Sequence, residues 1–224
     1  MRKTNQIARP TTKEEYAYNL LRAAILACEL APGQKLVIDR LSAEMGISPI
    51  PIRAALQRLG AEGLLISTPH AGAVVSPVSP ELIDEIFPLL AALEQTAVRA
   101  LQSGSIKAGL AGLRRLVIDM DMAVASQDSA AWTTLDFDFH VAMAEMSGMA
   151  LLIEFTTKTL ESWLRLNRCH FSQVGAPRLT QAQDEHWQML TLLEAEDVPG
   201  LEVLAGRHNL LALESYRSLL PDGR

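Results

Sequence analysis

Four side chains in the C-terminal two thirds of the chain have the types and the spacing of a metal site. In the segment LDFDFH, Asp136 and His140 are four residues apart, which places both on one face of a helix. His186 and His208 are 22 residues apart, and the midpoint of this interval falls in the turn sequence DVPG, residues 197–200. If two helices fold back at this turn, the two imidazoles meet at the same level.

One carboxylate and three imidazoles are suitable ligands for a divalent metal, with zinc the first candidate and nickel, cobalt or manganese as others. Such a ligand set leaves coordination positions open for water or for an acid. The residues alone leave an alternative open, in which each histidine is separately hydrogen-bonded in the core or at the surface. Asp138 falls on the other side of the same helix and is expected to be solvated, and His170 lacks any partner at metal spacing.

These side chains must be positioned by helices, because helical patterning continues almost unbroken after residue 77. Short loops between the segments predict an antiparallel all-α bundle. A segment rich in proline, TPHAGAVVSPVSPEL, precedes the bundle and predicts a domain boundary, with domains at 1–76 and 77–224. Six helices are predicted, at 80–103, 106–126, 129–146, 150–169, 177–196 and 201–220.

The charge of the chain divides at the same boundary. Residues 1–76 carry nine Lys/Arg and six Asp/Glu, whereas residues 77–224 carry eleven Lys/Arg and twenty Asp/Glu. The first domain is therefore basic and the rest of the chain acidic. This indicates that only the first domain binds a polyanion. No apolar run is long enough to span a membrane, and the basic N-terminus lacks the apolar stretch of a signal peptide, so we expect no membrane partner and a cytoplasmic location.

The segment ISPIPIRAALQRLGAEGLL places two prolines at the start of a helix. Proline is tolerated there because the first amides of a helix have no internal partner. Ser48 is predicted to cap this helix with its side chain, and Gly63 to end it. A short helix with Asp39 as its predicted cap precedes it, and Gly46 forms the turn between the two. With an earlier helix at 12–28 and a hairpin formed by LLIST and AVVS, the pattern predicts a winged helix-turn-helix with a small β wing.

The stretch from ILACELAPGQKL to GAVVSPVS resembles the DNA-binding domain of GntR-family transcriptional regulators, through motifs such as APGQKL, LSAEMGIS, PIRAALQRLGAEGL and GAVV. The resemblance implies that Arg53 is the arginine that contacts bases in the major groove. An arginine near the start of a helix can donate two hydrogen bonds to a guanine. Ser48 is expected to hold a phosphate and Ile50 to meet a thymine methyl. Arg40 and His70 are candidate backbone contacts, with a plain surface role as the alternative. Relatives often have arginine or threonine where this chain has Pro49 and Ile50, so its set of base-reading side chains is reduced.

The segments DFDFHVAMAEMSGMALL, EHWQML and RHNLL resemble the FCD effector domain of the FadR subfamily. The resemblance implies that Asp136, His140, His186 and His208 bind one metal ion. It also implies an effector pocket, in which Leu90 stands where relatives often carry an arginine. Two candidate effector-binding residues, Asn167 and Arg168, lie on the fourth helix of this domain, although Asn167 could equally bond a neighbouring helix.

Together these features predict a homodimeric transcriptional regulator that binds a palindromic double-stranded DNA operator, most simply as a repressor, and is not an enzyme. Its affinity for the operator would be controlled by a small carboxylate effector at or near the metal. Two alternatives remain open at this point: a regulator that senses the metal itself, and a metal-dependent hydrolase, for which Glu185 is the adjacent carboxylate.

Overall fold

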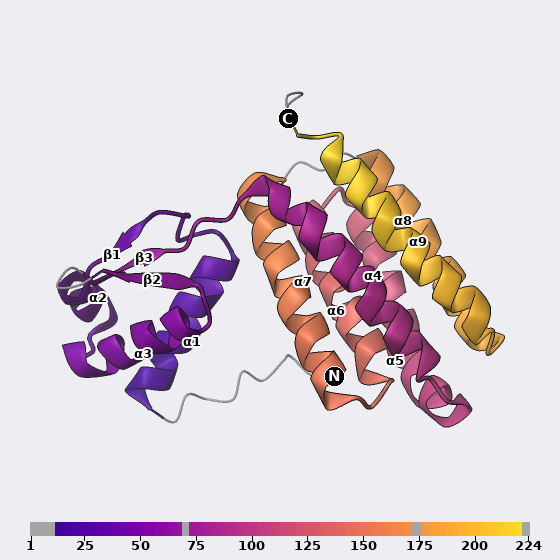
Figure 1. Ribbon diagram of the computed structural model, residues 1–224, viewed down its shortest axis with the longest axis horizontal. Coiled ribbons are helices and arrows are strands. Elements are labelled where there is room, and N and C mark those ends of the chain that lie inside the picture. Colours follow the sequence, from indigo (N-terminus) through magenta and orange to yellow (C-terminus); the bar gives the residue numbers. More distant parts are fainter. Residues whose placement is uncertain (1–11, 69–71, 172–175, 221–224) are drawn as a thin grey trace. The chain divides into compact units, whose positions relative to one another are not determined.

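The computed structural model of the 224-residue chain describes residues 12–68, 72–171 and 176–220. The chain divides into two compact units, Met1–Val78 and Ser79–Arg224, each with its own hydrophobic core (Figure 1). The fold is mostly α, with a small antiparallel sheet confined to the first unit. This confirms the fold class predicted from the sequence.

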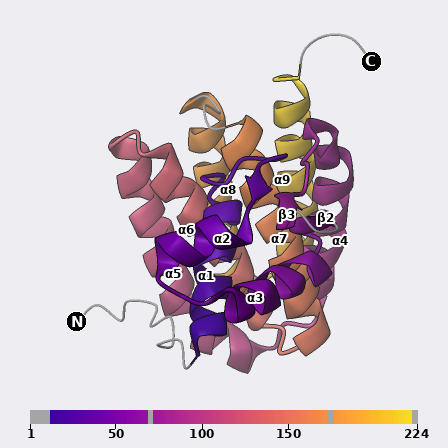
Figure 2. The ribbon, with the colours of Figure 1, turned by 90° about the vertical axis from the view of Figure 1, so that its left-hand side faces the viewer.

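The first unit contains the helices of the predicted helix-turn-helix, with α3 crossing α1 (Figure 2). Thr12 begins α1, because its side-chain oxygen accepts a hydrogen bond of 3.0 Å from the Glu15 amide. Gly46 connects α2 and α3 with a φ of +65°, a backbone conformation that glycine adopts without a steric penalty. The three helices are α1 (Lys13–Leu26), α2 (Ile38–Met45) and α3 (Pro49–Ala61).

Of the two predicted helix caps, one is correct in position only and the other is wrong. Ser48 does stand at the N-cap of α3, but its side chain accepts no hydrogen bond from the helix. A side-chain cap usually accepts from the second or third amide of the helix, and the third residue of α3 is Pro51, which has no N–H. The cap of α2 is Val37, so Asp39 lies within the first turn of that helix instead.

The wing is a three-stranded antiparallel sheet in the order β1-β3-β2. The predicted hairpin is formed by β2 (Leu65–Thr68) and β3 (Gly72–Val75), with Leu65 opposite Val75. A third strand, β1 (Lys35–Leu36), pairs with the other edge of β3 and was not predicted. At two residues it is too short to show the alternating pattern by which strands are recognised in a sequence.

The second unit is a bundle of six α-helices within its described residues (Figure 1). Each predicted helix is present, with ends that differ by a few residues. Pro80–Leu82 forms a short 3-10 turn, and Asp197 caps the last helix by accepting from the Gly200 amide at 3.0 Å. Among the described residues, no helix is both long enough and apolar enough to cross a membrane. The helices are α4 (Ile83–Arg99), α5 (Ser103–Ala125), α6 (Ser129–Glu145), α7 (Ala150–His170), α8 (Ala176–Glu194) and α9 (Val198–Arg217).

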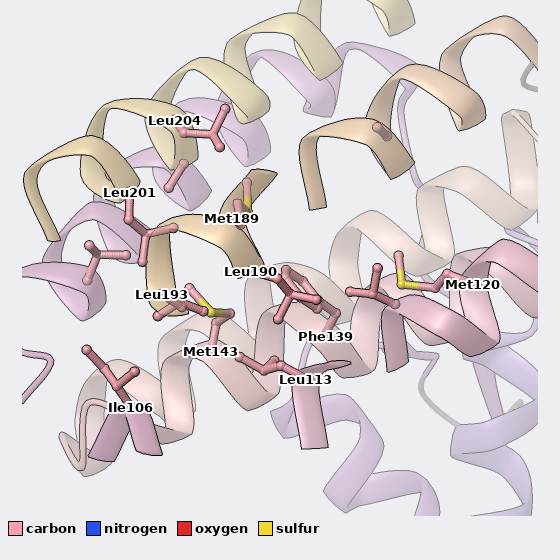
Figure 3. Packing of buried hydrophobic residues seen from close by; sticks show 14 of the residues in the cluster. Ile106, Leu113, Met120, Phe139, Met143, Met189, Leu190, Leu193, Leu201 and Leu204 are labelled. Carbon is pink, nitrogen blue, oxygen red and sulfur yellow. The ribbon is translucent and has the colours of Figure 1, made fainter. Parts of the chain in front are cut away.

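The main core of this bundle lies between α5, α6, α8 and α9 (Figure 3). Phe139 from α6, Leu113 from α5 and Leu190 from α8 are almost fully buried there. Burial of each such side chain contributes about 1.5–3 kcal/mol to folding. Because Phe139 directly precedes His140 in the chain, and its ring lies 4.7 Å from that of His186, this packing also sets the positions of two predicted metal ligands.

Candidate metal centre

Three helices bring together the four side chains that the sequence singled out. Asp136 and His140 lie on α6, His186 on α8 and His208 on α9, and one potential ligand atom from each lies within 4.8 Å of the others. All four side chains are buried, with relative exposures of 5% or less. The fold-back of α8 and α9 places the rings of His186 and His208 with centroids 4.9 Å apart. We call these four residues the metal cluster.

The carboxylate of Asp136 is the common neighbour of two imidazoles in the metal cluster. Its Oδ1 atom lies 3.3 Å from Nε2 of His186 and 3.6 Å from Nε2 of His140. The ring centroid of His140 lies 5.4 Å from that of His186 and 5.2 Å from that of His208. The donor atoms therefore converge on one small region, as the ligands of a single ion must.

Two further carboxylates hold the outer nitrogens of the imidazoles. Glu94 Oε1 lies 2.8 Å from Nδ1 of His140, and Glu185 Oε2 lies 2.6 Å from Nδ1 of His208. Glu94 is itself held by Asn209, whose amide donates to Oε2 at 2.8 Å. Metal-binding histidines commonly use one nitrogen for the ion and give the other to a carboxylate, which fixes the ring and raises its basicity. This arrangement leaves Nε2 of both rings for an ion.

Several atoms of the metal cluster have no hydrogen-bond partner among the described residues. They are Oδ1 of Asp136 and both ring nitrogens of His186. Leaving buried polar atoms unpaired is costly, and native proteins rarely do so without a reason. A cation bound between Asp136 and His186 would satisfy Oδ1 of Asp136 and Nε2 of His186, so the residues present fit a metal ion.

The electrostatics of the metal cluster also favour a cation. Burial by itself lowers the pKa of His140, but the neighbouring carboxylates of Glu94 and Asp136 outweigh burial and raise it to about 10. The pKa of His186 lies well below its usual value, because the site is buried and because the other cationic groups oppose a further proton. The buried carboxylates therefore favour positive charge beside them. A divalent ion bound by neutral imidazoles would supply this charge.

A partly open cavity adjoins the metal cluster. Asp136, His140 and His208 form part of its wall. Arg178, near the start of α8, also lines it and contacts Glu185 Oε2 at 3.5 Å and the His208 carbonyl oxygen at 3.3 Å. Leu90 also lines the cavity, so the position at which the resemblance implies an arginine carries an apolar side chain here.

The two candidate effector residues, Asn167 and Arg168, are not part of the lining of this cavity. Asn167 is buried and donates a hydrogen bond of 2.5 Å to the hydroxyl of Tyr216, which does line the cavity. This corresponds to the alternative in which Asn167 bonds a neighbouring helix. Arg168 donates to Oγ1 of Thr134 at 3.3 Å.

Three of the candidate DNA-binding residues share the exposed side of α3 and its N-cap. Ser48, Ile50 and Arg53 are all exposed, and Ile50 is 79% exposed, which is unusual for so large an apolar side chain. Arg40 is exposed on α2 and forms an ion pair of 2.7 Å with Glu44. His70 lies outside the described residues.

Asp138 does not lie where the sequence predicted. It is half-buried, and burial raises the pKa of its carboxyl. The reason is that α6 packs against α4, α5 and α7, which leaves little of its surface open to solvent. The expectation of a solvated Asp138 was therefore wrong.

Sequence reasoning missed Glu94, Asn209 and Arg178, although one signal for Glu94 was available. The buried positions of α4 include Ile83, Ile86, Phe87 and Leu90, and Glu94 continues the same stripe. A carboxylate at an apolar position of a helix indicates a buried partner. Asn209 and Arg178 carried no such signal, because only the packing of α9 and α8 turns them inward.

Replacing Glu94 by glutamine should weaken zinc binding by about 10–100-fold, because removal of an outer partner of a ligating histidine typically has this effect. Competition with a chromogenic zinc chelator would measure the change. Glu85→Gln is the matched control, since Glu85 lies exposed on the same helix. Equal zinc affinities of the two variants would show that Glu94 does not support the metal cluster.

Two family models match the chain. Residues 13–75 match the model described as bacterial regulatory proteins, gntR family, and residues 85–210 match the FCD domain. The Nta operon transcriptional regulator of Aminobacter aminovorans is 28% identical over 78% of this chain and 81% of its own length. The transcriptional repressor RspR of Escherichia coli K12 is 23% identical over 90% of this chain and 88% of its own length.

Solved structures share the fold. E. coli McbR/YncC superposes with a TM-score of 0.75 at 21% identity, covering 92% of this chain and 97% of that one. A putative GntR regulator from Rhodococcus sp. RHA1 gives a TM-score of 0.72 at 21% identity, covering 96% of this chain and 100% of that one. At this level of identity the likeness concerns the fold alone.

Proposed function

The chain belongs to the GntR family of bacterial regulatory proteins and carries an FCD domain, and from this we propose that it is a metal-dependent repressor controlled by a small carboxylic acid. It is a transcriptional regulator, and regulators of this family bind DNA. The proposal concerns the direction of control, the metal and the effector. Repression is supported by RspR, a relative that is itself described as a repressor.

The observation that carries the proposal is the metal cluster. Four ligand atoms from three helices lie within 4.8 Å of one another, and the buried Oδ1 of Asp136 and ring nitrogens of His186 have no partner among the described residues. Asp136, His140, His186 and His208 would hold the ion, and zinc, nickel, cobalt or manganese suits this set. When bound, the ion would supply positive charge and an open coordination position beside the cavity.

DNA recognition would use the exposed face of α3. Arg53 would donate two hydrogen bonds to a guanine in the major groove, and Ile50 would contact a thymine methyl. Ser48 lies at the positive end of the helix dipole, where a phosphate binds favourably. A two-fold homodimer would present two copies of this face to a palindromic operator.

An effector can alter DNA binding only to the extent that it binds one conformation more tightly than another. In this proposal the acid enters the cavity beside the metal cluster and favours the conformation of the homodimer that fits the operator poorly. Operator affinity then falls by the ratio of the acid's affinities for the two conformations, by thermodynamic reciprocity.

The alternative of a metal-dependent hydrolase finds little support. Glu185 was the candidate general base, yet its carboxylate is engaged by Nδ1 of His208 and by Arg178. Its role is thereby to orient a ligand rather than to take a proton from water. The relatives and the structures with the same fold are regulators as well.

Operator binding with and without metal separates the proposal from a pure metal sensor. An operator is first selected from a random pool of double-stranded DNA, and its affinity is then measured for chelator-treated protein, zinc-loaded protein, and zinc-loaded protein with a panel of carboxylic acids. We expect one zinc per chain by native mass spectrometry and a loss of operator affinity only when zinc and an acid are both present. A response to zinc alone would identify a metal sensor, and failure to bind any divalent ion would overturn the proposal.

A further inference from the structure

The cavity beside the metal cluster contains hydrogen-bond donors that lack acceptors. Trp132, Trp163 and Arg178 all line it. Nε1 of Trp132 and Nη1 of Arg178 are buried and have no hydrogen-bond partner among the described residues, whereas Nε1 of Trp163 lies close to the hydroxyl of Tyr216. Buried donors are rarely left unpaired in native proteins, so the cavity is suited to a ligand that accepts hydrogen bonds.

The charges around the cavity favour a ligand that carries a single negative charge. Asp136 and Glu94 line the cavity. Glu185 does not line it but forms an ion pair with Arg178, which does. A divalent ion in the metal cluster, together with the guanidinium of Arg178, balances these three carboxylates. A monoanion then leaves one excess negative charge in a buried region, whereas a dianion leaves two, and unbalanced buried charge is costly.

Most of the remaining wall of the cavity is apolar, with Asn209 and Tyr216 as its polar members. Leu90 and Leu160 line it with exposures of 2% and 1%, and Phe87 lines it while stacked on Tyr216 at a centroid distance of 5.3 Å. Together with the indole rings of Trp132 and Trp163, these side chains present flat and branched hydrocarbon surface. Such a wall contributes to binding by removing apolar ligand surface from water.

We infer that the effector is an apolar monocarboxylate, with an aromatic or branched aliphatic body. This inference rests on the proposed function and gives the chemical class of its ligand. The carboxylate lies beside the metal cluster, where Arg178 and the indole N–H group of Trp132 donate to it. The body packs against Phe87, Leu90 and the indole rings.

Two other classes of organic acid fit this cavity poorly. A sugar acid carries several hydroxyl groups, and each would lose its hydrogen bonds to water against the leucine and phenylalanine wall. A dicarboxylate would place its second charge in the same apolar region, because Arg178 is the one lysine or arginine among the described residues that line the cavity.

Calorimetric titration of the zinc-loaded full chain with four acids tests the inference. Phenylacetate and 4-methylpentanoate represent the inferred class, gluconate the sugar acids, and succinate the dicarboxylates. We expect the first two to bind at least about tenfold more tightly than the last two, because burying the apolar body is worth more than one factor of ten in affinity. Gluconate or succinate binding as tightly as phenylacetate would overturn the inference and leave the proposed function standing, whereas no binding by any of the four would overturn both.

Single substitutions in tryptophan test the role of the donors. Trp132→Phe removes the N–H and keeps an aromatic ring, and it should weaken phenylacetate binding by about tenfold, as expected for the loss of a hydrogen bond to a charged acceptor. Trp187→Phe is the matched control, because Trp187 lies outside the lining of the cavity and donates to Asp121. Zinc content is measured for each variant to show that the metal cluster is intact. Unchanged phenylacetate affinity in a zinc-replete Trp132→Phe protein would overturn the assignment of this donor.

Discussion

Replacing Arg53 by alanine is expected to abolish sequence-specific operator binding while leaving the protein folded. Arg53 lies exposed on the first turns of α3, so the substitution removes no buried contact. A bidentate contact from arginine to guanine contributes about 1–3 kcal/mol of discrimination, and a homodimer would lose it at both half-sites. Electrophoretic mobility shift or fluorescence anisotropy with the selected operator and a scrambled sequence would measure the loss.

The control for this prediction must remove the same charge without removing the same contact. Arg115→Ala meets this requirement, because Arg115 is exposed on α5 of the other unit. Far-UV circular dichroism of both variants should match the wild type. If Arg53→Ala retains the preference of the wild type for operator over scrambled DNA, then Arg53 does not read bases and another part of the exposed face of α3 must do so.

Replacing His186 by alanine is expected to remove stoichiometric zinc from the purified protein and to eliminate thermal stabilisation by added zinc. His186 is fully buried at the centre of the metal cluster, and the loss of a direct ligand should exceed the 10–100-fold effect typical of an outer partner. Binding to the folded state stabilises it by about 2.7 kcal/mol when the free ion is at 100 times its Kd. Thermal melts with zinc and with chelator, together with metal analysis, would measure both effects.

The alanine substitution also leaves a cavity beside Phe139 and Trp132, which lowers stability whether or not a metal binds. The decisive quantity is therefore the difference between melting temperatures with zinc and with chelator, which a cavity alone does not change. His170→Ala serves as the control, since His170 is exposed at the end of α7. A His186→Ala protein that keeps full zinc occupancy would refute the role given to this ligand.

The elements of this fold were predictable because their signals are local. Pro49 and Gly63 delimit α3, and the residues between them carry the periodic apolar stripe that packs on α1. The register of the α8–α9 hairpin followed from the same kind of reasoning, since two helices that fold back at residues 197–200 must bring His186 and His208 to one level. The family membership rests on motifs of this kind as well.

Errors arose where one local signal had to be weighed against another. Ser48 has the residue type of a side-chain cap, yet Pro51 removes an amide that such a cap would use. Asp138 has the helical position of a solvated residue, yet neighbouring helices cover much of α6. In both cases the residue type suggested one environment and its neighbours imposed another.

The sequence by itself determined the helices and the family, and it singled out the four side chains of the metal cluster, because each depends on residue type and spacing along the chain. Only the tertiary structure decided what surrounds that cluster. Glu94 reaches His140 from α4, and Arg178 and Trp163 enter the cavity from α8 and α7. These contacts join residues far apart in the chain, and the packing angles that create them are set by the whole core, which leaves no periodic trace in the sequence.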